Sequence, residues 1–110
     1  MKILAIEHEN KNATPAQFAR YAHAEAARAW ELHQRGFLRE LYFRADREEA
    51  VLVLECDDVE MAESLLATLP LVEQGLITFE IIPLRPYPGF ARLFDASSTV
   101  ATSEESEQPS

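Results

Sequence analysis

The spacing of hydrophobic positions changes along the chain and divides it into strand-like and helix-like stretches. Residues 2–8 are apolar almost throughout, which predicts a central β-strand. Residues 15–35 carry apolar side chains at intervals of three and four, the spacing of an amphipathic helix. The inward-facing stripe expected for this helix consists of Phe18, Ala22, Ala26, Ala29, Trp30 and His33.

The two ends of this helix are marked by residues that favour those positions. Thr14 can cap the first turn, Pro15 suits the first helical position, and Gln17 can complete a capping box. Gly36 can adopt the left-handed conformation that ends a helix. We therefore expect one helix that begins at Pro15 and ends just before Gly36.

A hairpin is predicted after Gly36. A regular strand over residues 37–44 would alternate its side chains between two faces. One face would carry Arg39, Leu41 and Phe43, and the other Leu38, Glu40, Tyr42 and Arg44. Residues 46–49 form a polar turn, and residues 51–54 are a run of strand formers. Charged side chains are sparse in most strands, so we expect any chemistry to lie near this hairpin.

The second half of the chain predicts another helix and a final strand. Asp57 or Asp58 can cap a helix that continues to residue 69, where Pro70 ends it. Residues 71–75 form a connector, and residues 76–82 a fourth strand. The resulting order is strand, helix, strand, strand, helix, strand.

This order is typical of an α+β, ferredoxin-like βαββαβ fold, with a four-stranded antiparallel sheet and both helices on one face. The other sheet face is too apolar to remain in contact with water. We therefore expect a homodimer through the open sheet face, which would form a dimeric α+β barrel.

Composition limits the domain organisation and the partners. Residues 1–94 are expected to form the barrel domain, and residues 95–110 an acidic, Ser/Thr-rich disordered tail. The net charge of −9 and the lack of a basic stripe argue against a nucleic-acid partner. No stretch has the length and apolarity of a membrane span, so no membrane partner is expected. The single cysteine, Cys56, fits a reducing cytoplasm.

Two segments resemble the muconolactone isomerase family. The sequence QRGFLRELYFR at residues 34–44 is similar to the end of that family's first helix and its second strand. The sequence LPL at residues 69–71, followed by a strand and LRPYP at residues 84–88, resembles the family's final segment. The family often has an aromatic residue, Arg and His where this chain has Leu38, Arg39 and Glu40.

The resemblance implies a small cytoplasmic enzyme, without cofactor or metal, that shifts a double bond in a small unsaturated lactone or carbonyl acid. Such a reaction needs a base with a tuned pKa and a donor for the developing oxyanion. Arg39 matches the family's Arg and is expected to bind a carboxylate or oxyanion of the small-molecule ligand. Glu40 and His8 are the candidates for proton transfer, and Tyr42 and Trp30 for lining the pocket.

Structural roles compete with each of these assignments. Arg39 could pair with Glu55 or Glu80 across the sheet, and Glu40 could be a solvated or interface acid. Core packing is the alternative for Trp30. The histidines and Cys56 show no metal-ligand spacing, so no metal site is expected.

Two other functions remain open. The first is a cofactor-free oxygenase or cyclase on the same barrel, which a large apolar cavity lined by Trp30, Tyr42 and Phe residues would favour. The second is a non-enzymatic dimeric ligand-binding or accessory protein, which a filled interior would favour. A polar pocket containing Arg39 with an acid or His nearby would favour the isomerase.

Overall fold

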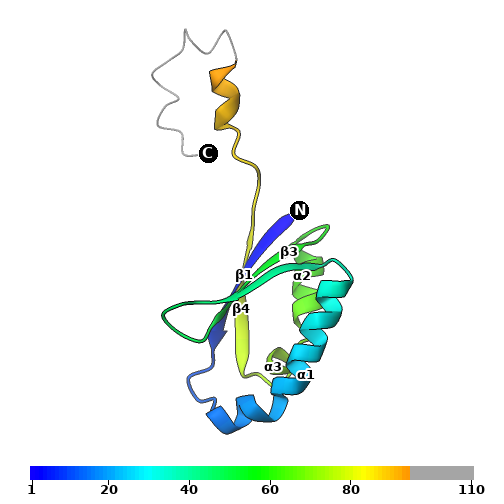
Figure 1. Cartoon of the computed structure of the whole chain (residues 1–110), viewed down its shortest axis with the longest axis vertical. Helices are drawn as coiled ribbons and strands as arrows, with labels where there is room; N and C mark the ends of the chain where they lie inside the picture. The colour runs from blue at the N-terminus through cyan, green and yellow to red at the C-terminus, as the bar shows by residue number, and fades with distance from the viewer. Residues whose placement is uncertain (95–110) are drawn as a thin grey trace.

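The computed structural model describes residues 1–94, and the tail predicted for residues 95–110 lies outside the described part of the chain. The elements are β1 (Lys2–Glu9), α1 (Pro15–Gln34), β2 (Leu38–Phe43), β3 (Ala50–Glu55), α2 (Val59–Leu66), α3 (Pro70–Glu73), β4 (Ile77–Pro83) and the 3-10 helix η1 (Gly89–Leu93). The strands form one antiparallel sheet in the order β2-β3-β1-β4. The helices α1, α2 and α3 lie on the same side of this sheet (Figure 1). The predicted α+β, ferredoxin-like arrangement is therefore confirmed.

The helix α1 begins and ends at the residues that the sequence marks. Gln17 N donates to Thr14 Oγ1 over 3.3 Å, and Thr14 N donates to Gln17 Oε1 over 2.8 Å, which completes the capping box. Gly36 has a φ of 86°, and its N–H donates to the carbonyl of His33. This left-handed residue turns the chain from α1 into β2.

The core lies between the helices and one face of the sheet. Its buried residues include Ile3 and Ala5 of β1, Leu52 and Leu54 of β3, and Leu32 of α1. Alternate residues on the strands point to this side, as the two-residue period of a strand requires. The packing of α1 and α2 on this face fixes where the site can form.

A β-bulge in β2 changes the predicted alternation of its side chains. Leu38 pairs with Leu54 and Glu40 pairs with Val53, so Arg39 is the extra residue. As a result Leu38 lies on the helix side, where it is 2% exposed, and shares that side with Leu41 and Phe43. The prediction that Leu38 shares a face with Glu40 and Tyr42 is wrong.

The inward stripe predicted for α1 is also partly wrong. Trp30 is 59% exposed, whereas Leu32, which was left out of the stripe, is 2% exposed. His33 is exposed as well. The buried side of α1 therefore includes Ala29 and Leu32, and Trp30 lies outside it.

The second helical region is broken where a single helix was predicted. The helix α2 ends at Leu66, and Pro70 begins α3 instead of following a helix. Proline suits a first helical turn because it has no N–H to leave unpaired. Leu69, between the two helices, is 2% exposed and joins the core.

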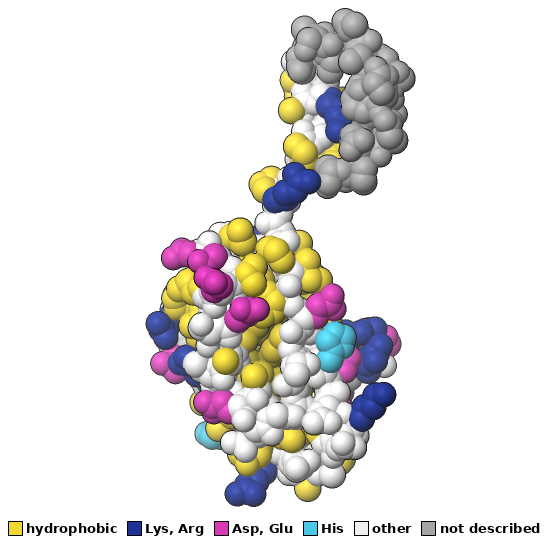
Figure 2. Space-filling model, turned by 180° about the vertical axis from the view of Figure 1, so that it is seen from behind, with side chains coloured by type: hydrophobic (Ala, Val, Ile, Leu, Met, Phe, Trp, Pro, Cys, Tyr) yellow, Lys and Arg dark blue, Asp and Glu magenta, His cyan; other side chains and the backbone are white. Residues whose placement is uncertain are grey.

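The sheet face opposite the helices has no cover within residues 1–94. The half-buried apolar residues on it are Leu4, Ile6, Val51, Val53 and Ile82. Beyond β4, an arm over residues 84–94 leaves the body and exposes hydrophobic side chains (Figure 2). In this arm Tyr87 and Phe90 make an edge contact with ring centroids 5.0 Å apart, and Phe94 is 85% exposed.

Candidate functional site

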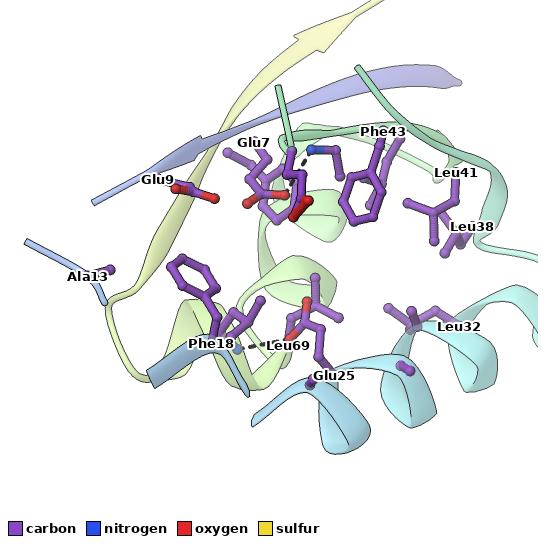
Figure 3. Close-up of a pocket in the computed structure, with 18 of the residues that line it drawn as sticks. Glu7, Glu9, Ala13, Phe18, Glu25, Leu32, Leu38, Leu41, Phe43 and Leu69 are labelled. Atoms are coloured by element: carbon purple, nitrogen blue, oxygen red, sulfur yellow. Dashed lines mark hydrogen bonds between the residues drawn. The ribbon is translucent and has the colours of Figure 1, made fainter. Parts of the chain in front are cut away.

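A cavity of about 750 Å³ separates α1 from the sheet (Figure 3). Its floor is the alanine-rich face of α1, and its roof is the helix side of β1, β2 and β3. The hydrophobic lining includes Phe18, Leu32, Leu38, Leu41, Phe43, Leu52, Leu69 and Phe79. The small side chains of Ala22, Ala26 and Ala29 leave this space open, because larger residues there would reach the sheet.

Glu7 projects from β1 into this cavity. It is only 6% exposed, and its Oε1 accepts a hydrogen bond of 2.9 Å from Ala50 N. Within residues 1–94 no hydrogen bond reaches its Oε2. Burial raises the pKa of Glu7 above its ordinary value; the hydrogen bond from Ala50 lowers it, and the negative charges of Glu9, Glu49 and Glu25 raise it further.

Glu25 projects from α1 on the opposite wall (Figure 3). Its Oε1 accepts a hydrogen bond of 2.9 Å from Leu71 N, the backbone of α3. Burial raises the pKa of Glu25, and the hydrogen bond from Leu71 opposes that shift. The cavity thus holds one carboxyl group on each wall, and both take up a proton more readily than an exposed Glu.

Further acids surround the mouth of the cavity. Glu9 and Glu48 line it and are exposed. Glu49 is 8% exposed; its Oε2 accepts from Glu9 N over 3.1 Å, and its Oε1 lies 3.4 Å from Arg47 Nε without hydrogen-bond geometry. Among residues 1–94 the cavity lining includes four Glu and no Lys, Arg or His.

This arrangement suits proton transfer to and from an apolar ligand. A raised pKa brings a carboxyl group closer to the range that suits a general acid or base. Two such groups on facing walls can reach opposite sides of one ligand. The cavity volume lies within the range of small-molecule sites in proteins.

Three of the predicted site residues lie together in a second, smaller pocket of about 400 Å³. Trp30, Arg39 and Glu40 line this recess with His33, and it shares Ala26, Ala29, Leu38 and Leu41 with the main cavity. Arg39 Nε donates to the carbonyl of Gly36 over 2.7 Å. The ring of Trp30 lies against His33 with centroids 5.4 Å apart. The recess is therefore an extension of the main cavity past the bulge.

The other predicted residues lie on the open face of the sheet. Tyr42 pairs in register with Val51, and its hydroxyl donates to Glu40 Oε1 over 2.7 Å, which raises the pKa of the Tyr42 phenol. His8 lies on the same face of the sheet, with its Nε2 3.5 Å from Glu80 Oε1. His8 is thus separated by the sheet from the main cavity.

Glu7 and Glu25 are not among the sequence-predicted site residues, although the sequence carries a signal for each. Glu7 follows Ile3 and Ala5 at intervals of two, so alternation places it on the buried face of β1. Glu25 lies three residues after Ala22 and four before Ala29, on the inward stripe of α1. A charged residue in a buried pattern is an indicator of function.

Within the described residues 1–94, no three His, Cys, Asp or Glu side chains converge on a point that could hold a metal ion. No helix in the same residues has the length and apolarity needed to cross a membrane.

A family model identifies the family of this chain, and two solved structures share its fold. The model of the muconolactone delta-isomerase family matches residues 5–89. A crystal structure of muconolactone isomerase superposes with a TM-score of 0.66 at 22% identity, and the match covers 80% of this chain and 92% of that one. A 5-chloro-2-hydroxyhydroquinone dehydrochlorinase from Burkholderia phenoliruptrix, in complex with 2,5-dihydroxybenzoquinone, has a TM-score of 0.61 at 14% identity and covers 81% and 98%. No curated protein matches the chain.

Proposed function

Because this chain belongs to the muconolactone delta-isomerase family, we propose that it shifts a double bond in a small unsaturated lactone or related carbonyl compound by proton transfer. One observation carries the proposal. Two carboxyl groups with raised pKa, Glu7 and Glu25, face each other across a mostly apolar cavity. The sequence indicates the family, and these two carboxyl groups add a candidate site.

The proposed reaction uses one carboxyl group as base and the other as acid. The carboxylate takes a proton from the carbon beside the carbonyl, and the electron pair moves toward the carbonyl oxygen to form a dienolate. The other carboxyl group, which is protonated, then gives its proton to the far carbon of the conjugated system, and the double bond forms in its new position. Exchange of protons with water returns both carboxyls to their starting states, so the net reaction is an isomerisation.

Burial supports these roles physically. A buried carboxylate is poorly solvated, which makes it a stronger base toward a carbon acid. The hydrogen bonds from Ala50 N and Leu71 N hold the two side chains in place. The direction of transfer, from Glu7 to Glu25 or the reverse, depends on the orientation of the ligand.

The recess beside Arg39 has a supporting role in this proposal. The guanidinium of Arg39 and the ring of Trp30 would contact the end of a ligand that extends out of the main cavity. Glu40 lines the same recess and stays a second candidate for proton transfer. His8 and Tyr42 would lie at an interface between subunits rather than beside the ligand.

The test is an absorbance assay of double-bond migration in unsaturated γ-lactones. Glu7→Gln and Glu25→Gln should each lower kcat about 100-fold or more, the usual contribution of a general acid or base. Glu40→Gln tests the second candidate in the recess and should lower kcat less than tenfold if the carboxyl groups of the main cavity transfer the protons. Full loss in Glu40→Gln with activity retained in the other two variants would move the reaction to the recess. No turnover of any lactone by the wild type would end the isomerase proposal.

A cofactor-free oxygenase or cyclase is the second candidate. The cavity is large and mostly apolar, and Phe18, Phe43 and Phe79 line it, which favours an aromatic ligand. Trp30 and Tyr42, expected in such a cavity, are absent from its described lining. Oxygen uptake or ring closure on a polycyclic aromatic precursor, without lactone turnover, would support this candidate.

We also propose a homodimer through the open sheet face. The half-buried Leu4, Ile6, Val51 and Val53 on that face would become fully buried against a second sheet. The exposed aromatic side chains of the arm, Tyr87 to Phe94, would pack on the partner subunit.

A further inference from the structure

The break between α2 and α3 brings the backbone of α3 to the wall of the main cavity. Leu69, in the break, is 2% exposed and belongs to the core, and both Leu69 and Leu71 line the cavity (Figure 3). Pro70, between them, begins α3. The LPL sequence that carries part of the family resemblance therefore lies beside the ligand space, although the proposed reaction assigns no role to its side chains.

The backbone N–H of Leu71 has no acceptor within α3. The N–H groups in the first turn of a helix lack partners in that helix, and a side chain at the N-cap usually accepts from one of them. Here the N-cap is Leu69, which has no acceptor atom in its side chain, and Pro70 has no N–H. Val72 N and Glu73 N donate to the Leu69 carbonyl, over 3.0 and 2.9 Å. The N–H of Leu71 is therefore left for an acceptor from outside α3.

Glu25 on α1 supplies this acceptor. Its Oε1 accepts from Leu71 N over 2.9 Å, and among residues 1–94 no hydrogen bond reaches its Oε2. Burial raises the pKa of Glu25, and the hydrogen bond from Leu71 lowers it. One carboxyl oxygen of Glu25 is thus held by the backbone of α3, and the other is left for a ligand.

A second contact fixes the same segment to α1. Arg28 Nε donates to Thr68 Oγ1 over 2.9 Å, and that hydroxyl donates to the Leu65 carbonyl over 2.6 Å. Arg28 follows Glu25 by three residues on α1, and Thr68 precedes Leu71 by three residues. The two contacts with α1 together limit the movement of the backbone donor relative to its carboxyl acceptor.

We propose that residues 68–71 are a positioning element for Glu25, which holds one oxygen of its carboxyl group so that the other faces the ligand. Thr68 and the backbone of Leu71 act through Glu25, so they are positioning residues and not catalytic ones. The break in the second helical region fits this role, because a continuous helix would use the N–H of Leu71 in its own hydrogen bonds. The use of Glu25 in a reaction rests on the proposed function, whereas the pKa of Glu25 can be measured without turnover.

The direct test replaces the backbone amide of Leu71 by an ester, which removes the N–H and keeps the side chain. The pKa of Glu25, followed by NMR of its carboxyl carbon, should rise, because the hydrogen bond from Leu71 lowers it. The kcat for an unsaturated γ-lactone should fall about ten- to a hundredfold, the value of a hydrogen bond to a charged group. The same replacement at Val72 is the matched control. It removes a hydrogen bond within α3 and should leave the pKa of Glu25 and kcat at their wild-type values.

Thr68→Val is a second variant, which keeps the shape of the side chain and loses the hydroxyl. The pKa of Glu25 should rise in this variant as well, because the segment is less firmly attached to α1, and Thr68→Ser should restore the wild-type value.

An unchanged pKa of Glu25 in the Leu71 ester or in Thr68→Val would overturn the proposal. An equal loss of kcat in the two esters would also overturn it, because the effect would then come from the stability of α3. A wild type that turns over no lactone would end the proposed isomerase function, and the pKa of Glu25 in these variants would still decide whether the segment positions that carboxyl group.

Discussion

Replacing Glu7 by Gln should stabilise the protein at alkaline pH. Glu7 carries a buried charge among other acids, and the pKa of Glu7 is raised from its ordinary value of 4.5. The folded state therefore binds this proton more tightly than the unfolded state. The wild type loses stability as the pH rises from the pKa of Glu7 in the unfolded state through its pKa in the folded state. Above both pKa values the full loss in the free energy of unfolding is present. Gln has no proton to lose, so the variant lacks this contribution.

The size of the effect follows from two opposing terms. Each unit by which folding raises a pKa corresponds to about 1.4 kcal/mol. The hydrogen bond from Ala50 N opposes the shift, and Gln keeps that bond through its Oε1 at a loss of roughly 1 kcal/mol relative to a charged acceptor. Burial raises the pKa of Glu7 by more than the hydrogen bond lowers it, since the net shift is upward. Because the cavity is open to solvent, we expect a net gain of about 1 kcal/mol, or about 4–8 °C in Tm.

The assay is thermal unfolding of both proteins at pH 4 and pH 8, at one protein concentration because a dimer makes Tm depend on concentration. The variant should match or fall below the wild type at pH 4 and exceed it at pH 8. Glu63→Gln on the exposed face of α2 is the control and should show no such crossover. A Glu7→Gln variant that is less stable than the wild type at pH 8 would refute the electrostatic account of the cavity.

Three other predictions concern the dimer, a turn and the recess. Light scattering should give about twice the 12.4 kDa chain mass, and truncation after Leu84 should weaken association; a stable monomer would contradict the interface. Gly36→Ala should destabilise the fold by about 1 kcal/mol, measured by denaturant unfolding, because alanine resists a positive φ; unchanged stability would contradict this. Arg39→Ala should lower kcat/KM about ten- to a hundredfold, the value of a charge-assisted contact, and Arg39→Lys should rescue it only in part; unchanged kinetics would remove Arg39 from the site.

The order of the elements could be predicted because periodicity and capping act locally. Thr14 and Gln17 form the expected capping box, and Gly36 ends the helix as predicted. The resemblance to the muconolactone isomerase family is confirmed by the family match over residues 5–89. These signals need only neighbouring residues, so the sequence carries them directly.

The errors arise where contacts between distant parts of the chain determine the local structure. The bulge at Arg39 depends on how β2 pairs with β3, and no residue near it marks the extra position. Trp30 has the apolar area of a core residue, yet the helix places Leu32 under the sheet instead. Apolar area alone does not determine which side of a helix is buried.

Glu7 and Glu25 could not be identified by searching the hairpin after Gly36, although its charges are the most conspicuous in the sequence. Glu7 lies in β1 and Glu25 in α1, and only the packing of α1 over the sheet brings them to one cavity. Each fits its local pattern as a single charge on a buried face. Recognising them as a pair required the tertiary structure.

The central claim is that Glu7 and Glu25 move protons within the cavity. The most direct measurement is NMR of an unsaturated γ-lactone in D₂O, with deuterium followed at the carbon that gains a proton when the double bond moves. The wild type should incorporate deuterium there as the double bond migrates, and Glu7→Gln and Glu25→Gln should each slow incorporation about 100-fold or more. Incorporation at the wild-type rate in both variants would contradict the account.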